Sequence, residues 1–323
     1  MGRLSIVAVL AGAFLGWVAP GAAFAQAWPT KPVRMVVPFP PGGATDIIGR
    51  LVAGKMQEVW GQTVIVENKP GAGTVVATEY VAKSPPDGYT MGFVITGHVI
   101  NPSLRSHMPY DTLKDLAGVT QVSIQHLAMA ANPAFPANTV VELIALAKKS
   151  PGKIAYATPG SGTAMHLSVE LLKTKGGIDL LHVPYKGGAP AQQDVMGGRV
   201  PVLMDVHYAI LPLLKSGKLK MLGLLSPQRV KDHPEIPVVS ETVAGVSALS
   251  MVGLVVPIAT PRDLVHRISA DIAKAVRSSD LTERMVQLGM EPVGSTPEEF
   301  DAYIRSEMEK WAPVVKASGA KVD

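Results

Sequence analysis

The chain has 323 residues, of which 47% are hydrophobic and 5% aromatic, with a formal net charge of +4 and no cysteine. The lack of cysteine excludes disulfides and thiolate metal sites. Scattered lysines and arginines with few aromatic residues give no nucleic-acid footprint, and the length is sufficient for two domains.

The N-terminus has the three parts of a secretory signal peptide. Arg3 supplies a positive charge, residues 4–18 form an apolar run, and Ala23-Phe24-Ala25 is a small-x-small cleavage site. We therefore predict a signal peptide over residues 1–25, cleavage before Gln26 and a periplasmic mature protein. The alternative, an uncleaved anchor, is weaker because the apolar run is short for a membrane span.

From Val33 onward, β-like runs alternate with segments of helical periodicity. In the first third of the chain we predict strands at 33–37, 64–66, 89–95 and 119–130, helices at 47–60 and 75–83, and turns at 68–73 and 84–88. This β-α-β-α-β order is typical of a mainly parallel sheet covered by helices.

A second alternating unit follows a break at residues 132–136. The motif Thr139-x-x-Glu142 predicts a capping box for a helix at 140–149. Beyond it we predict strands at 154–158, 180–184, 200–204, 219–225 and 250–256, helices at 165–174, 190–196 and 207–215, and two last helices beginning at Thr260-Pro261 and Thr296-Pro297.

The strands at 119–130 and 250–256 are interpreted as the two crossing segments of a hinge. This interpretation makes one domain discontinuous, with residues 26–128 and 249–323, and the other an insertion, with residues 129–248. The predicted fold class is α/β, with two domains and a ligand cleft between them.

Two glycine-rich loops, at residues 38–46 and 157–163, each follow a predicted strand and precede a predicted helix. Backbone N–H groups at such a turn, together with the helix dipole, form a site for an anion. The candidate ligand-binding residues are Phe39, Gly42, Gly43, Ala44 and Asp46 in the first loop and Thr158, Gly160, Ser161, Gly162 and Thr163 in the second. The alternative for the first loop is a tight turn with Asp46 as a helix cap. His166 is expected to hold the second loop by a hydrogen bond.

Five further candidates lie at or just after the carboxyl ends of predicted strands, where open α/β sheets bind ligands. These residues are Thr96, His98, Tyr185, Asp205 and His207. For each an ordinary structural role remains open: a turn and a solvated imidazole at 96–98, packing for Tyr185, a helix cap for Asp205 and a helix-surface position for His207.

The sequence contains no recognisable catalytic or metal-binding motif. Pro159 precedes Gly160-Ser161-Gly162, which is therefore not a nucleophile elbow. There is no phosphate-binding loop, no H-E-x-x-H motif and no metal spacing among the eight histidines. We expect no cofactor and no metal, and keep a glycine-loop enzyme acting on a phosphorylated substrate as an alternative.

Many short motifs occur in one order along residues 28–323, and together they resemble the Bordetella-uptake-gene (Bug) family of solute-binding proteins from tripartite tricarboxylate transporters. They include Trp28-Pro29-x-Lys31-Pro32, Pro38-Phe39-Pro40-Pro41-Gly42-Gly43, Glu67-Asn68-Lys69-Pro70-Gly71, Pro86-Asp87-Gly88-Tyr89, Tyr156-Ala157-Thr158-Pro159-Gly160-Ser161-Gly162-Thr163 and Pro184-Tyr185-Lys186-Gly187-Gly188. His207 and Met251 depart from the family pattern, in which an apolar residue and tryptophan are usual.

The resemblance implies a two-domain, Venus-flytrap fold of the type II kind and no catalytic activity. It implies that a small carboxylate (a dicarboxylate, an amino acid or an aromatic acid) is bound on the two glycine loops for uptake by membrane permease subunits. We expect a monomer. An orphan subunit that senses the ligand for a signalling partner is the main alternative.

Overall fold

The computed structural model describes residues 28–231 and 233–322. The predicted signal peptide lies outside the described residues. Within the described part of the chain, no helix is long and apolar enough to cross a membrane.

The described strands form one curled sheet with the order β2-β1-β3-β9-β4-β7-β5-β6, and β10 and β8 also pair with β4. The strands are β1 (Val33–Val37), β2 (Val64–Asn68), β3 (Thr90–Ile95), β4 (Leu116–Ala131), β5 (Ala155–Thr158), β6 (Leu181–Pro184), β7 (Val202–Val206), β8 (Lys220–Leu224), β9 (Leu249–Pro257) and β10 (Glu291–Pro292). All five predicted strands of the second unit, and the four of the first, are present.

The long strand β4 joins the two halves of the sheet. Its residues 116–126 pair with β9, whereas residues 127–131 pair with β7 and 128–131 with β8. Pairs β1–β2, β1–β3, β5–β6 and β5–β7 are parallel, but β4 and β9 run antiparallel to their neighbours. The prediction of a mainly parallel sheet is therefore correct within each half and wrong at the two strands that connect the halves.

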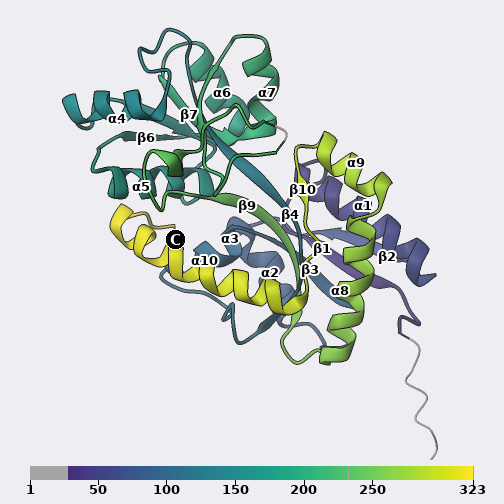
Figure 1. Cartoon of the computed structure of the whole chain (residues 1–323). Helices are drawn as coiled ribbons and strands as arrows, with labels where there is room; N and C mark the ends of the chain where they lie inside the picture. Colours follow the sequence, from purple (N-terminus) through teal and green to yellow (C-terminus); the bar gives the residue numbers. More distant parts are fainter. Residues whose placement is uncertain (1–27, 232, 323) are drawn as a thin grey trace, which may run out of the picture.

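Helices cover both faces of each half, giving two lobes (Figure 1). They are α1 (Ala44–Trp60), α2 (Val75–Ala82), α3 (Gly97–Leu104), α4 (Val140–Lys149), α5 (Ala164–Gly176), α6 (Gly188–Met196), α7 (His207–Lys215), α8 (Arg262–Val276), α9 (Ser279–Gln287) and α10 (Pro297–Ser318). In the first lobe, α1, α8 and α9 share one hydrophobic core. A second core runs from α2, α3 and α10 into α4 and α5 of the other lobe, and a third lies under α6 and α7.

Most predicted helix starts are confirmed, with small differences. Thr296 and Glu299 form a complete capping box for α10. At α4, Thr139 accepts a hydrogen bond from the Glu142 amide, but the Glu142 carboxylate accepts from Asn138 rather than from Thr139. Pro261 is the N-cap of α8 and not its first helical residue.

Candidate functional site

The first glycine loop leaves the N-terminus of α1 open. Gly42 and Gly43 are exposed, and Gly42 has a φ of +92°, which glycine adopts without strain. Gly43 is the N-cap of α1, and no side chain of the described residues caps this helix. The first-turn amides of α1 therefore have no partner within the helix and lie at the positive end of its dipole.

Asp46 shapes this loop from beneath. Its carboxylate is buried and accepts hydrogen bonds from the Gly42 amide (2.9 Å), Arg50 Nε (3.0 Å) and Asn68 Nδ2 (2.8 Å). Burial acts to raise the pKa of Asp46, but the bonds from Arg50, Gly42 and Asn68 outweigh it and lower that pKa to about 2. Asp46 is therefore ionised and fully engaged by the protein, and it orients a loop amide as expected.

Asn68 at the end of β2 is a loop-positioning residue that the sequence reasoning assigned only to a turn. Its Nδ2 also donates to the Phe39 carbonyl at 2.8 Å, and its Oδ1 accepts from Arg50 Nη2 at 3.0 Å. Asn68 thus ties both ends of the loop to β2. The motif that contains Asn68 was the one indication of this role in the sequence, but its position in the chain could not show which loop the Asn68 side chain contacts. Phe39 and Ala44 are half-buried.

The second glycine loop satisfies more of its own polar groups than the first. Thr163 caps α5 by accepting a hydrogen bond from the His166 amide (3.2 Å) and donates its hydroxyl to the Gly160 carbonyl (2.8 Å). The Gly162 amide donates to His166 Nδ1 at 3.1 Å, which confirms the expected loop-holding role of His166. The exposed Ser161 lies at the outer part of this loop.

A stack of aromatic rings lies under the second loop. The rings of His166 and His182 are 3.9 Å apart and nearly parallel, and Tyr156 stacks on His182 at 4.9 Å. His182 Nε2 lies 2.7 Å from the Thr158 hydroxyl. Burial is the main cause that lowers the pKa of each histidine to about 4, so both imidazoles are neutral at pH 7.

The second loop also touches the other lobe. A Cβ added to Gly162, whose φ is +72°, would lie 2.5 Å from Leu104 Cδ2 at the end of α3. The absence of a side chain at residue 162 therefore lets α3 approach the loop closely. In turn, Asn101 and Arg105 donate to the carbonyls of Gly73 and Ala72, so α3 is held to the loop before α2.

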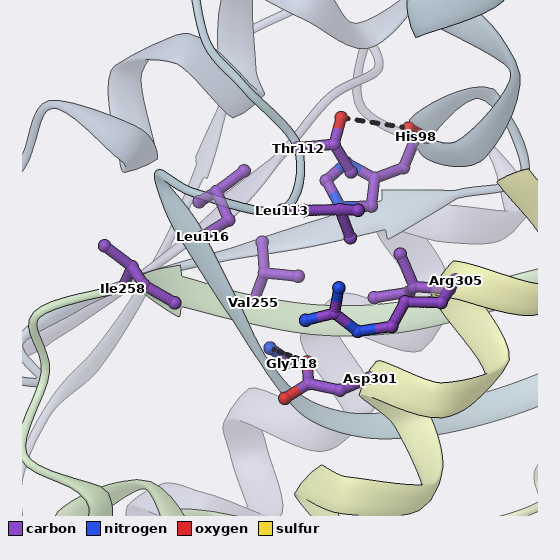
Figure 2. A pocket seen from close by; sticks show the side chains of 10 residues that line it. His98, Thr112, Leu113, Leu116, Gly118, Val255, Ile258, Asp301 and Arg305 are labelled. Atoms are coloured by element: carbon purple, nitrogen blue, oxygen red, sulfur yellow. Dashed lines mark hydrogen bonds between the residues drawn. The ribbon is translucent and has the colours of Figure 1, made fainter.

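Thr96 and His98 lie inside the first lobe, not among the glycine loops. The buried Thr96 hydroxyl accepts a hydrogen bond from the Met251 amide at 3.0 Å. The His98 ring lines a cavity of about 30 Å³ with Thr112, Asp301 and Arg305 (Figure 2). Both of its ring nitrogens are buried without a partner among the described residues, and burial lowers the pKa of His98 to about 4. The His98 side chain is thus buried between α3 and α10 and not at the glycine loops, and a ligand contact for His98 stays a prediction.

Asp205 and Tyr185 are both engaged by protein groups. Asp205 is 3% exposed and accepts from Gln192 Nε2 (2.9 Å) and the Val206 amide (2.8 Å). Burial raises the pKa of Asp205, and these two hydrogen bonds act against that rise. The Tyr185 hydroxyl donates to Asp194 at 2.7 Å. A Cβ added to Gly188 would lie 2.8 Å from the Asp205 carboxylate, which explains a glycine there.

His207 is not a helix-surface residue, since its side chain is 7% exposed. It lines a cavity of about 680 Å³ between α7, the α9–β10 turn and the loop after β8. None of the predicted residues of the two glycine loops lines this cavity. The structure therefore places Tyr185 beside the second loop, since its amide donates to the Thr158 carbonyl at 3.0 Å, and Asp205 against the Gly188 end of the same segment. Thr96 and His98 lie inside the first lobe, and His207 lies at the cavity.

Among residues 28–231 and 233–322, no hydrogen bond or ion pair joins the two glycine loops. The same residues contain no group of three or more His, Asp or Glu side chains suited to hold a metal ion. What the arrangement offers is backbone amides at two strand-to-helix turns, one on each lobe, with their supporting side chains already satisfied.

Comparison with known proteins gives a family match over residues 48–320, described as the tripartite tricarboxylate transporter family receptor. BugT of Bordetella pertussis is 34% identical over 325 residues, which cover 100% of this chain and 99% of BugT. A UPF0065 protein of Pseudomonas sp. strain P51, from its tcbD-tcbE intergenic region, is 35% identical over 294 residues, which cover 90% of this chain and 87% of that protein.

Solved structures share the whole fold. A protein of R. palustris with adipate is 32% identical, with a TM-score of 0.78 and coverage of 91% of this chain and 100% of that one. MatC from Rhodopseudomonas palustris with bound malate is 28% identical, with a TM-score of 0.74 and coverage of 89% and 100%. The two-lobe, periplasmic-binding-protein fold is therefore common to this chain and to proteins that hold dicarboxylates.

Proposed function

The chain belongs to the tripartite tricarboxylate transporter family of receptors, and on that premise we propose that its two glycine loops bind a small carboxylate between the lobes. Receptors of this family are periplasmic solute-binding proteins and not enzymes. The observation that carries the proposal is the N-terminus of α1, which begins at Gly43 without a side-chain cap and leaves its first-turn amides open, while Asp46 is occupied by the Gly42 amide, Arg50 and Asn68.

The ligand class follows from the amide donors. A hydrogen bond from an amide to a carboxylate is charge-assisted and stabilises by roughly 1.5–3 kcal/mol. Several such bonds support micromolar binding, which corresponds to about 8 kcal/mol. Because a similar protein holds adipate and another malate, we propose a dicarboxylate first, and an amino acid or an aromatic acid as the other candidates.

Binding on both loops would close the lobes, since a ligand that contacts both favours the closed state. We propose that residues 26–128 and 249–323 move as one domain and residues 129–248 as the other. Support comes from β4, which exchanges β9 for β7 and β8 as partners near residue 127. In this proposal Thr96, Tyr185 and Asp205 stabilise the carboxyl ends of β3, β6 and β7.

The proposed route is secretion with cleavage before Gln26, followed by delivery of the ligand to permease subunits of a tripartite tricarboxylate transporter. A receptor that reports its ligand to a signalling partner would use the same site. The glycine-loop enzyme is not favoured, because the hydroxyl that meets an imidazole at the second loop, that of Thr158 beside His182 (2.7 Å), belongs to a fully buried residue.

The test is native mass spectrometry of freshly purified protein, followed by a thermal-shift screen of mono-, di- and aromatic carboxylates. We expect a co-purified acid or a selective rise in melting temperature, because a ligand that binds only the folded state stabilises it. No bound species and no shift with any acid would contradict the proposal, and release of a product from a tested phosphorylated substrate would favour the enzyme alternative.

A further inference from the structure

Gly289 and Tyr208 bring the two lobes into close contact beside the strands that connect them. Gly289 follows α9 in the first lobe, and Tyr208 is the second residue of α7 in the other lobe (Figure 1). A Cβ added to Gly289 would lie 1.9 Å from Tyr208 Cβ and 2.3 Å from Tyr208 Cγ. Rotation of the tyrosine side chain does not relieve the overlap with Cβ, because the backbone fixes the position of that atom. A side chain at residue 289 therefore requires α7 and the α9–β10 turn to move apart.

The contact lies close to the hinge and at the ligand-facing edge of the second lobe. Val206, two residues before Tyr208, pairs with Leu127, where β4 exchanges β9 for β7 as its partner. Gly289 directly precedes the segment that leads into β10, which also pairs with β4. Helix α7 begins at the carboxyl end of β7, and β7 runs parallel to β5, so Tyr208 and the second glycine loop lie at the same edge of the sheet. A small displacement here, next to the pivot, produces a larger one at the glycine loops.

A hydrogen bond joins the lobes at the same place. His126 Nδ1 lies 2.8 Å from the Ser226 hydroxyl, and His126 Nε2 lies 3.1 Å from a Glu291 carboxylate oxygen. His126 and Glu291 stand on β4 and β10 in the first lobe, whereas Ser226 follows β8 in the second. Because a carboxylate only accepts, Nε2 of the neutral imidazole donates to Glu291 and Nδ1 accepts from Ser226. Glu291 thus holds His126 in the orientation that bonds to the other lobe.

We propose that Gly289 and Tyr208 are positioning residues for ligand binding, whose contact, together with the bond from Ser226 to His126, sets how closely the two glycine loops approach each other. The inference rests on the proposed function, because it concerns the closed state that a ligand on both loops favours. Neither residue belongs to a glycine loop, so a change at the contact alters the arrangement of the lobes and leaves the loop amides in place. A wedge at this contact lowers the fraction of chains that can close, and the apparent affinity falls in proportion.

Gly217 offers a matched control for a substitution at Gly289. Both glycines follow a helix with a φ of +68°, and each donates its amide to the carbonyl three residues earlier, Val286 for Gly289 and Leu214 for Gly217. A Cβ added to Gly217 would meet nothing within 4 Å. Gly289→Ala and Gly217→Ala therefore introduce the same backbone strain, and only Gly289→Ala obstructs the lobes.

The experiment combines calorimetric titration with adipate and malate and small-angle X-ray scattering of the full mature chain. We expect Gly289→Ala to bind about tenfold more weakly and to keep a larger radius of gyration at saturation, whereas Gly217→Ala should match the unmodified chain. Tyr208→Gly removes the atoms that the new methyl group meets, so adding Gly289→Ala to Tyr208→Gly should cost less than about twofold in affinity. Equal affinity and radius for the two alanine variants, or a tenfold loss that persists in the Tyr208→Gly background, would overturn the proposal.

A pair of serine variants tests the hydrogen bond and decides the outcome if Gly289→Ala does not fold. Ser226→Ala removes the bond between the lobes and should weaken binding about fivefold, the equivalent of one hydrogen bond of about 1 kcal/mol. Ser269→Ala is the control, because the buried Ser269 hydroxyl donates to the Ser295 carbonyl within the first lobe, and it should leave the affinity unchanged. Equal affinities in these two variants would contradict a role for the bond in closure.

Scattering without added acid separates this inference from the proposed function. If neither acid binds to the unmodified chain, the proposed function fails for these ligands, but the contact still joins protein atoms. Gly289→Ala should then have a larger ligand-free radius of gyration than Gly217→Ala. Equal ligand-free radii would overturn the inference in that case.

Discussion

Asp46 shows how one buried side chain at the start of a helix can hold a glycine loop in place. Its carboxylate is 2% exposed, and its oxygens accept hydrogen bonds from Gly42, Arg50 and Asn68. A charge held in this way does not repel an incoming carboxylate as a free one would, because Arg50 balances it. The sequence identified Asp46, but its contacts with Asn68 and Arg50 were found only in the structure. Asn68 lies far from Asp46 in the chain, and the direction of the α1 face that carries Arg50 was unknown.

Asp46→Asn should lower the free energy of unfolding by about 2 kcal/mol, the scale of hydrogen bonds to a charged group. Urea unfolding measures it, with Asp263→Asn as the control, because Asp263 stands in the first turn of α8 and is exposed. The folded pKa of Asp46 lies below its ordinary value, so the difference should be constant above about pH 4 and shrink as the pH falls toward 2. A control variant as destabilised as Asp46→Asn would contradict this role.

The buried histidines predict a second pH dependence, at higher pH. The pKa values of His98, His166, His182 and His207 are lowered by burial from 6.5 to about 4. Between these pH values the unfolded chain binds protons that the folded chain does not, so the free energy of unfolding should fall as the pH drops from 6.5 toward 4.

Urea unfolding at half-unit pH steps checks this dependence. The raised pKa values of Asp205 and Asp301 act in the opposite direction, so the informative quantity is a difference between variants. His166→Asn keeps an acceptor for the Gly162 amide and removes one titrating ring, and it should flatten the profile in this window. Identical profiles for the two proteins would show that His166 does not titrate as described.

At the scale of elements, the two glycine loops end in helices that are capped differently. Thr163 caps α5 with its own hydroxyl, whereas α1 has glycine at the N-cap and no side-chain cap among the described residues. Two similar glycine-rich motifs therefore differ in structure, because the helix N-terminus on the first lobe has no side-chain cap for its amides and the one on the second lobe does. Spacing could not reveal this difference, because it depends on which residue of each loop becomes the N-cap, glycine at α1 and threonine at α5.

Thr163→Ala should lower the free energy of unfolding by about 1 kcal/mol, the usual cost of losing a helix N-cap. Thr139→Ala is the matched control, since Thr139 caps α4 with the same 3.2 Å bond. We expect Thr163→Ala to be at least as destabilised as Thr139→Ala in thermal and urea unfolding, because Thr163 also donates to the Gly160 carbonyl, but weaker carboxylate binding only for Thr163→Ala. Equal ligand affinity in the two variants would remove the second loop from the site.

The predicted strands were confirmed because runs such as β1 and β7 are apolar and bounded by turn residues. Helix α3 was missed, since Asn101 and Pro102 look like a loop signal although Pro102 lies inside the helix. Its position depends on tertiary contacts: Asn101 bonds to Gly73 and Leu104 packs against Gly162. The same contacts turn His98 away from the loops, which no local pattern indicates.

For the whole molecule, β4 and β9 connect the lobes, and α10 contacts α5 across them. The predicted division at residues 128 and 248 follows from these strands and stays a prediction. Small-angle X-ray scattering tests it: saturating adipate or malate should reduce the radius of gyration of the unmodified chain. An unchanged radius in the presence of a ligand shown to bind would contradict closure.

The most direct test of the central claim compares two glycine-to-valine changes in the same segment by calorimetry. Gly43 and Gly54 both face open space, with nothing within 4 Å of an added Cβ, but only Gly43 lies at the open end of α1. With adipate, malate or the acid that gives the largest thermal shift, Gly54→Val should bind like the unmodified chain. Gly43→Val should bind at least about 100-fold more weakly, the loss of roughly two charge-assisted hydrogen bonds. Unchanged affinity in folded Gly43→Val would contradict binding at the glycine loop.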